Sequence, residues 1–551
     1  MRNLLSIIPL GGLEEIGLNM TVFDCQGDII IVDAGLMFPE EDMLGVDFVI
    51  PNFSYIVANK ERVRGILLTH GHEDHTGALP FLLKEIDAPV YGTALTLGLV
   101  REKLREHHLE NARLIPVRPR DKVKLGAFTV EFIRVTHSIV DGVGLGIETP
   151  LGRVVHTGDF KIDPTPVDGE LLDFHKFSEY GEKGTLLLMS DSTNAEKGGF
   201  TFSEKEVRRA FEDIFATAPG RIIISTFASN IHRIQQAIDV AVMFRRKVIL
   251  SGRSIVSNAS IALELGYLKL PLETWLKLED LGRLPDKEAV IITTGSQGEP
   301  MSVLSRIATG EHRHIKVKEG DTVILSAKMI PGNERSIGRI INHLFKRGAN
   351  VIYEKVSEIH VSGHASKEEL KLMMNIVRPK YFMPIHGEYR HLRYHAMLAE
   401  KQGIPKANIF ILENGDVLEI SDGEARRNGS ADSGRVFIDG KGIGDVGEIV
   451  LRDRMRLAHD GIVIVLLTVE KLTGAIVSGP DIISRGFVFE DASQELIGEV
   501  RGFLSGSVGK LDREIISDPS LLKAKIRGLL KKYIRDKMER HPMILPIIFE
   551  V

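Results

Sequence analysis

The chain has 551 residues, of which 43% are hydrophobic, and this length should divide into roughly three or four domains. Its formal net charge of −5 excludes a uniformly basic nucleic-acid-binding protein, although positive potential can still be concentrated locally. The single cysteine, Cys25, excludes an internal disulfide framework, so any zinc must be held mainly by histidine and carboxylate. No signal peptide opens the chain and no apolar run reaches the roughly 18 residues that span a bilayer, so we expect a cytoplasmic protein without a membrane segment.

Residues 4 to about 200 alternate short, β-branched runs with turns of Gly, Asp and Asn. We expect strands at residues 4–10, 29–33, 65–69, 128–134, 153–156 and 186–190, and helices at 77–85 and 94–107. Polar residues follow several of these strands, as Asp33, His70 and Asp159 do. Because a sheet fixes the loop after each strand, layered α/β architectures carry functional groups at such positions.

From about residue 203 to 355 the chain alternates strands with helices. We expect strands at 221–226, 247–251, 290–294 and 322–326, and helices at 203–216 and 231–244, which together predict a parallel sheet covered on both faces. Residues 356–420 return to histidines at strand ends and finish in a predicted hairpin at 409–420, with Asn-Gly at its turn.

A polar stretch at 421–434 is typical of a linker. Beyond it we expect strands near 462–469 and 486–489, a helix at 520–539 and a last strand at 544–551. The predicted division is therefore a discontinuous domain of residues 1–205 and 355–420, an inserted domain of 206–354, the linker, and a small α+β C-terminal domain of 435–551.

The densest cluster of polar residues reads His70-Gly-His72-Glu-Asp74-His75, on a predicted strand-to-helix turn. Three imidazoles and a carboxylate at this spacing suit a divalent metal, because histidine nitrogen is a good zinc ligand and aspartate adds a hard oxygen. The alternative is a solvated, histidine-rich turn. Three more residues stand near strand ends, and each taken singly is also compatible with a structural role: His137, Asp159 and His386.

Together with Asp33, these residues follow the order of the metallo-β-lactamase superfamily, which residues 1–205 and 355–420 resemble. The resemblance implies an α/β fold, an αββα sandwich with a two-zinc site at one edge of its sheets. It assigns the ligands as follows: His70, His72 and His137 to one zinc, Asp74, His75 and His386 to the other, and Asp159 to both. Manganese or another divalent metal stays open as an alternative to zinc.

A doubly wound block interrupts this domain before His386, and Val-Ser362-Gly363-His364-Ala365-Ser366 lies just beyond it. This arrangement resembles the β-CASP nucleases, in whose pattern Asp191, His364 and His386 match three motifs. The resemblance implies that metal-bound hydroxide attacks the scissile phosphate while His364, oriented by Asp191, protonates the leaving 3′ oxygen or stabilises the phosphate. With Asp74, these two are our candidate catalytic residues, and a structural His364 is the alternative.

Nearly the whole chain also resembles the ribonuclease J family, on three segments: Thr226-Phe-Ala-Ser229-Asn230-Ile-His-Arg, Thr294-Gly-Ser-Gln-Gly-Glu-Pro300 and Pro384-Ile-His386-Gly-Glu-Tyr-Arg-His. The family resemblance implies a 5′-to-3′ exonuclease that prefers a 5′-monophosphate and also cuts internally, in RNA maturation and decay. Our candidates for binding phosphate are Ser362, Gly363, His364, Ala365 and Ser366, with Ser229 and Asn230 as second contributors that also suit a helix cap.

The resemblance further implies RNA as the partner, a homodimer or homotetramer built through the C-terminal domain, and partner proteins in RNA degradation. Two alternatives stay open: a β-CASP nuclease that acts on DNA, and a non-catalytic RNA-binding subunit of the same fold. The intact set of seven ligands argues against the second. The alternative for the C-terminal domain is a part that only stabilises the fold.

Overall fold

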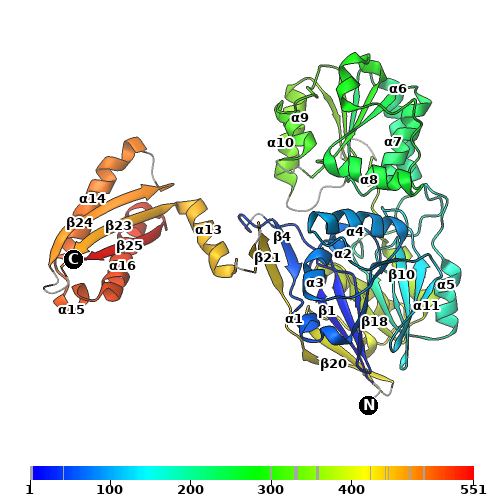
Figure 1. Cartoon of the computed structure of the whole chain (residues 1–551), viewed down its shortest axis with the longest axis horizontal. Coiled ribbons are helices and arrows are strands. Elements are labelled where there is room, and N and C mark those ends of the chain that lie inside the picture. The colour runs from blue at the N-terminus through cyan, green and yellow to red at the C-terminus, as the bar shows by residue number, and fades with distance from the viewer. Residues whose placement is uncertain are drawn as a thin grey trace. The chain divides into compact units, whose positions relative to one another are not determined.

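The chain forms two compact units, which are described separately (Figure 1). One contains residues 1–38 and 49–436, and the other contains residues 39–48 and 437–551, so the division falls within β4 (Phe48–Pro51) and β21 (Arg435–Asp439). The computed structural model describes residues 4–40, 42–297, 301–327, 333–354, 359–421, 423–440, 442–444, 446–470, 473, 475–487 and 490–551. In these ranges no helix is both long and apolar enough to cross a bilayer.

Most of the first unit is a sandwich of two sheets with helices on both outer faces, which confirms the predicted αββα architecture. The larger sheet has the order β20-β19-β1-β2-β3-β5-β6-β7 and the smaller has the order β18-β12-β11-β10-β9-β8. The strands of the larger sheet are β1 (Leu5–Gly11), β2 (Met20–Cys25), β3 (Asp28–Val32), β5 (Val63–Leu67), β6 (Val90–Gly92), β7 (Leu114–Pro116), β19 (Asp416–Ser421) and β20 (Glu424–Ser430). Those of the smaller sheet are β8 (Lys122–Leu125), β9 (Phe128–Arg134), β10 (Val143–Thr149), β11 (Gly152–His156), β12 (Thr185–Asp191) and β18 (Tyr381–Ile385).

Alternating side chains divide the core of the sandwich into layers. On β1, Leu5 and Ile7 pack between the two sheets, whereas Ile8 and Leu10 pack against the outer helices. The helices over the larger sheet are α1 (Ser54–Ala58), α3 (Leu79–Glu85) and α4 (Ala94–Glu106). Those over the smaller sheet are α5 (Phe174–Glu182), α11 (Lys367–Val377) and α12 (Tyr389–Lys401). Strands buried on both faces read as nearly continuous apolar runs, which is why they could be predicted.

Three parallel strands bring distant parts of the sequence to one edge of the smaller sheet. β11, β12 and β18 are neighbours, and the last pair aligns Asp191 with Ile385. The inserted domain separates β12 from β18 in sequence, but not in the sheet. Because parallel strands end on the same side, Asp159, Asp191 and His386 follow or finish these strands close together.

The inserted domain is a five-stranded parallel sheet with helices on both faces, as predicted, in the order β14-β15-β13-β16-β17. Its strands are β13 (Ile222–Ser225), β14 (Lys247–Ser251), β15 (Ala289–Thr293), β16 (Thr322–Leu325) and β17 (Asn350–Ile352). The helices α6 (Lys205–Thr217), α7 (Ile231–Met243) and α8 (Arg253–Glu264) pack on one face, and α9 (Val303–Thr309) and α10 (Glu334–Lys346) on the other (Figure 1). The bounds 206 and 354 stay a prediction.

Two expectations near residue 420 are wrong. The predicted linker at 421–434 contains β20, which pairs antiparallel with β19 at the edge of the larger sheet. Most side chains of this edge strand are exposed, so its polar composition resembles that of a linker. The predicted hairpin at 409–420 also fails, because only its second half is a strand and that strand pairs with β1 instead.

The second unit contains a three-stranded sheet in the order β24-β23-β25 and two long helices packed on one face. Its elements are β22 (Gly442–Ile443), α13 (Glu448–Asp460), β23 (Ile462–Val469), β24 (Ile476–Arg485), α14 (Glu490–Val508), α15 (Arg513–Ile516), α16 (Pro519–Met538) and β25 (Met543–Glu550). The strand at 462–469, the helix near 520–539 and the strand near 544–551 are confirmed. The predicted strand at 486–489 is not: residues 486 and 487 follow β24, and residues 488 and 489 lie outside the described ranges.

A buried ionic cluster connects the sandwich with the inserted domain. Glu204 lies between Arg233 of α7, 2.7 Å from its carboxylate, and Lys161, 3.5 Å away. Burial alone would raise the pKa of Glu204, but the two cations lower it to about 2, so the side chain is ionised at neutral pH. Arg233 also donates to the carbonyl of Ile359, on the segment that returns to the sandwich, 2.8 Å away.

Removing one cation should leave the buried carboxylate under-compensated. We expect Arg233→Ala to lower the free energy of unfolding by about 3–5 kcal/mol, the usual cost of breaking a buried pair. Arg209→Ala is the matched control, because Arg209 pairs with Glu206 on an exposed helix surface and should cost less than about 1 kcal/mol. Urea unfolding of both variants measures the difference, and equal losses would contradict this role of the buried cluster.

Candidate metal centre and active site

The histidine-rich segment follows β5 and makes a sharp turn into the short helix α2 (Glu73–Thr76). The turn is held by the neighbouring loop: Ala34 N–H donates to the carbonyl of His75, and Leu36 N–H donates to that of Glu73. Gly35 lies between them, where a Cβ atom would be 1.7 Å from the carbonyl oxygen of Asp74. Only glycine permits this approach, which fixes the direction of the side chains of α2.

Among the described residues three overlapping groups of side chains could hold a metal ion, the third of which contains His364, Asp191, Asp159 and His386. The first group, or cluster, consists of three imidazoles. His70 Nε2 lies 3.0 Å from His72 Nδ1, and His137 Nε2 lies 3.2 Å from the same atom. Ligands about 2.0–2.1 Å from one ion are separated by about 3 Å, so these spacings fit three nitrogens around a shared cation. The three imidazoles are therefore candidate ligands of one metal ion.

The second cluster contains two carboxylates and two imidazoles: Asp74, His75, Asp159 and His386. Asp74 Oδ2 lies 3.6 Å from His75 Nε2 and 3.5 Å from His386 Nε2. His386 Nε2 is buried and forms no hydrogen bond within the described residues, so this nitrogen is placed to donate a lone pair to a metal ion. This donor set fits a divalent cation.

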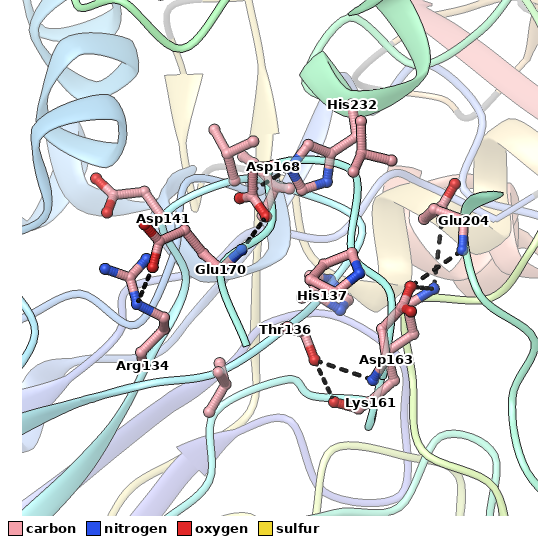
Figure 2. A pocket seen from close by; sticks show the side chains of 15 residues that line it. Arg134, Thr136, His137, Asp141, Lys161, Asp163, Asp168, Glu170, Glu204 and His232 are labelled. Atoms are coloured by element: carbon pink, nitrogen blue, oxygen red, sulfur yellow. Dashed lines mark hydrogen bonds and ion pairs between the residues drawn. The ribbon is translucent and has the colours of Figure 1, made fainter. Parts of the chain in front are cut away.

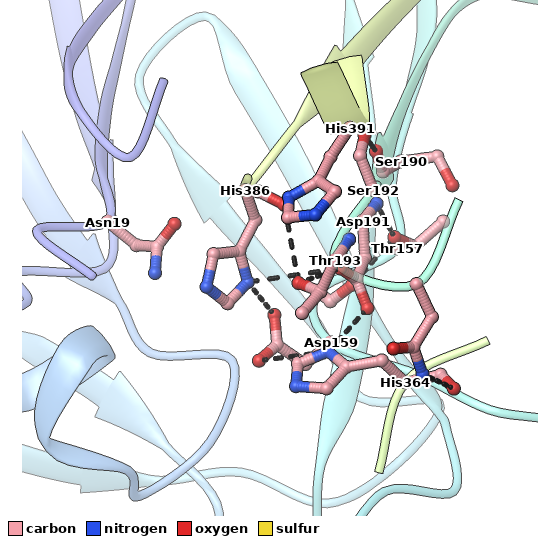
Figure 3. Close-up of polar contacts among 12 residues, drawn as sticks. Asn19, Thr157, Asp159, Ser190, Asp191, Ser192, Thr193, His364, His386 and His391 are labelled. Atoms are coloured by element: carbon pink, nitrogen blue, oxygen red, sulfur yellow. Dashed lines mark hydrogen bonds and ion pairs between the residues drawn. The ribbon is translucent and has the colours of Figure 1, made fainter. Parts of the chain in front are cut away.

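Asp159 lies between the two clusters. Its Oδ2 atom is 3.3 Å from His75 Nε2, 3.7 Å from His70 Nε2 and 3.8 Å from His137 Nε2. Its other oxygen accepts from His386 Nδ1 at 2.8 Å (Figure 3). The carboxylate is therefore within reach of both groups of nitrogens.

The charges of the two clusters differ. Burial lowers the pKa of His72 to about 4 and that of His137 to about 3, and holds that of His70 well below its usual range, so these rings are neutral and can donate lone pairs. Burial opposes a charge on His386 as well, but Asp159 outweighs it and raises the pKa to about 10. The carboxylates of the second cluster thus attract positive charge, which protons or a metal ion can supply.

Outer hydrogen bonds fix the orientation of the ligands. Asp33 accepts from His75 Nδ1 at 2.7 Å, and from both the N–H and the Oγ1–H of Thr69 at 2.8 Å. The carbonyl of Gly363 accepts from His137 Nδ1 at 2.7 Å. Such partners set the tautomer of a metal-binding histidine and strengthen its free nitrogen as a ligand.

His364 and Asp191 form a pair beside the second cluster. His364 Nδ1 donates to Asp191 Oδ2 at 2.8 Å and lies 3.9 Å from Asp159 (Figure 3). Burial would raise the pKa of Asp191, but the charge of His364 holds it below its usual range. The side chains of His364 and Asp74 are 20% and 30% exposed, whereas those of Asp159 and His386 are 3% exposed, so the site is open at the first two.

Several of the predicted phosphate-binding residues contact other parts of the protein. Ser362 Oγ accepts from the Asn194 amide at 2.8 Å, and Ala365 is buried. The N–H of Ser366 donates to Glu369 at 2.7 Å, at the start of α11. Asn230 caps α7 by accepting from the N–H of Arg233, which is the role that the sequence left open as an alternative.

Sequence reasoning missed several residues of the site. The amide of Asn19 lies 3.1 Å from both His75 Nε2 and the carbonyl of Asp74. A pocket beside His137 is lined from both domains by charged side chains, with His232 of α7 3.2 Å from Asp168 (Figure 2). No spacing rule applies to these residues, because only tertiary contacts bring them to the site.

Comparisons with known proteins agree with this geometry. Four family models match the chain: "Metallo-beta-lactamase superfamily" at residues 17–215, "Ribonuclease J, beta-CASP domain" at 219–344, "Zn-dependent metallo-hydrolase RNA specificity domain" at 348–411 and "Ribonuclease J C-terminal domain" at 449–551. The chain is 45% identical to Ribonuclease J 1 of Streptococcus pyogenes serotype M3. The 547 aligned residues cover 99% of this chain and 98% of that protein.

Two further matches differ in how far they extend. Ribonuclease J of Helicobacter pylori is 43% identical over 541 residues, which is 98% of this chain and 78% of the relative. A solved structure of a protein of unknown function from Enterococcus faecalis V583 shares the fold with a TM-score of 0.55 at 16% identity. That match covers 76% of this chain and 100% of the other.

The outer hydrogen bonds predict a change in metal affinity. Because Asp33 orients His75, we expect Asp33→Asn to weaken metal binding about 10- to 100-fold. Asp28→Asn is the control, since Asp28 pairs with Arg64 away from the clusters. Competition with a chelator of known affinity measures both variants, and unchanged metal binding by Asp33→Asn would show that this contact does not support a ligand.

Proposed function

Because the chain belongs to the ribonuclease J family of metal-dependent ribonucleases, we propose that it degrades RNA from the 5′ end, prefers a 5′-monophosphate, and also cuts internally, in cytoplasmic RNA maturation and decay. The observation that carries this proposal is the placement of the His364–Asp191 pair at the open side of two ligand clusters with Asp159 between them. A phosphodiester that reaches the clusters there also meets an imidazole.

We propose two zinc ions per chain, with manganese or another divalent metal as the alternative. His70, His72 and His137 would hold one ion, Asp74, His75 and His386 the other, and Asp159 both. Bound there, the ions would activate water near neutral pH and neutralise charge on the scissile phosphate.

The chain's own residues supply the proton transfer. Asp191 accepts the Nδ1–H of His364, so the Nε2 atom is the one that carries a proton to the leaving 3′ oxygen. A buried carboxylate on one nitrogen fixes both the tautomer and the orientation of the ring. Asp33 and the Gly363 carbonyl do the same for His75 and His137.

We propose that the 5′-phosphate binds the segment from Ser362 to Ala365. Within the described ranges the N–H groups of Gly363 and Ala365 donate to no protein acceptor, which supports an anion site made of backbone donors. Ser366 is engaged by Glu369, and Asn230 by the start of α7, so for these two, and for the neighbouring Ser229, the contact to phosphate has less support.

The second unit is proposed to join copies of the chain. One face of its sheet packs on α14 and α16, while the other leaves apolar side chains exposed, among them Ile483, Leu545 and Phe549. An apolar sheet face of this kind is covered when it meets another copy. Sedimentation equilibrium that found only monomers would contradict this role.

One digest tests substrate, direction and metal together. The substrate is RNA that is labelled at its 5′ end and carries either a monophosphate or a triphosphate there. We expect the protein to shorten it from that end, and faster when the end is a monophosphate. The metal content of the same protein preparation is measured in parallel. A matched DNA strand is the control, and faster cleavage of DNA would overturn the choice of RNA. Binding of RNA without cleavage by metal-loaded protein would favour a non-catalytic subunit.

The role of His364 can be separated from metal binding. We expect His364→Ala to keep the metal content nearly unchanged and to lower RNA cleavage by about 10²- to 10⁴-fold, as loss of a general acid does. Elemental analysis and single-turnover kinetics measure the two effects. Loss of metal from this variant would instead make His364 a ligand.

A further inference from the structure

Two phenylalanines are exposed beside the candidate active site, in the loop between β12 and α6. Phe200 and Phe202 have 61% and 65% of their surface exposed. Leaving rings of this size in water costs free energy that most folded proteins avoid, and clustered exposure of this kind marks binding surfaces.

The loop is held firmly although its rings face outward. Between the two rings, Thr201 points inward: its Oγ1–H donates to the carbonyl of His364 at 2.8 Å and its N–H donates to Glu369 at 2.7 Å. Lys161 donates to the carbonyl of Phe202 at 3.3 Å. The backbone that carries the two rings is therefore held next to the segment that contains His364.

Local charge favours a polyanion at this surface. The neighbouring acidic side chains have basic partners: Glu206 pairs with Arg209, Glu368 pairs with Lys371, and Glu196 shares Arg390 with Glu388. Lys205 forms no ion pair with any residue in the described part of the chain, and Lys367 lies over the ring of Tyr394. The surface thus has positive charge that no carboxylate of the protein neutralises.

We propose that Phe200 and Phe202 form a stacking platform for unpaired bases of the RNA strand close to the scissile phosphate, with Lys205 and Lys367 attracting its backbone. This inference rests on the proposed cleavage of RNA. The site is open at His364, so a strand that enters there passes the loop that contacts His364. Stacking accepts every base, because each has a π face, which suits an enzyme that must advance along any sequence.

Fluorescence of a stacked base tests the platform in the metal-loaded protein. The probe is a 5′-monophosphorylated phosphorothioate RNA, which resists hydrolysis, with 2-aminopurine at one position at a time. We expect wild-type protein to quench the fluorescence at one or two positions. Phe200→Ala and Phe202→Ala should lose that quenching and weaken binding about 5- to 150-fold each, and Phe→Trp at the same positions should restore both.

Two controls separate stacking from a general loss of binding. Phe345→Ala removes a ring that is 50% exposed on α10, and should bind the probe as the wild type does. An abasic nucleotide at the quenched position should weaken binding to the wild type but have little further effect on the double alanine variant, because the two changes remove the same contact.

Three results would decide against the platform. In the first, both alanine variants bind and quench the probe as the wild type does. In the second, the wild-type protein cleaves RNA but quenches the probe at no position. In the third, light scattering gives the double alanine variant a smaller molar mass than the wild type. The last would mean that another copy of the chain covers the rings. Quenching by wild-type protein that cleaves no RNA would instead contradict the proposed function and leave the platform standing.

Discussion

The carboxylate of Asp159 is the contact on which the site depends. Its two oxygens lie 2.8–3.8 Å from ring nitrogens of four histidines, His70, His75, His137 and His386. These come from the turn after β5, the loop after β9 and the end of β18. A buried negative charge is stable only when cations or donors surround it, so the carboxylate and the imidazoles require one another, and bound divalent metal would satisfy both.

The segment that follows β11 carries Asp159 and also connects this site with the inserted domain. Lys161 follows Asp159 by two residues and lies 3.5 Å from Glu204, which in turn contacts Arg233. Arg233 reaches the returning segment at Ile359, a few residues before Ser362 and His364. Both crossings between the domains therefore meet at one buried charge network, and the loop with Phe200 and Phe202 lies between that network and His364.

A feature of the fold or of the site could be predicted where the residues that determine it lie close together in the sequence. The candidate ligands could be proposed because His70 to His75 lie in one short segment and the other candidates follow apolar strands. The parallel sheets could be predicted from buried β-branched runs. Tertiary contacts decided the rest. The contact of Ser366 with Glu369 is an exception, because the spacing Ser366-x-x-Glu369 is that of a capping box and could have been recognised from the sequence. The sequence of β20 predicts a linker, because an exposed edge strand can have a composition as polar as that of a loop. Asn19 and Thr201 reach the site through loops, for which no spacing rule exists.

The pairing of β18 with β12 has a consequence for the order in which the protein becomes active during synthesis. A growing chain that has not yet released residues 381–386 from the ribosome lacks β18 and His386, and it also lacks β19 and β20 of the larger sheet, although it already contains the other six candidate ligands. The inserted domain, which is made of local strand–helix units, precedes β18 in the sequence and is synthesised before it. A product that ends before residue 386 of the 551 therefore lacks one of the candidate ligands and cannot complete the site.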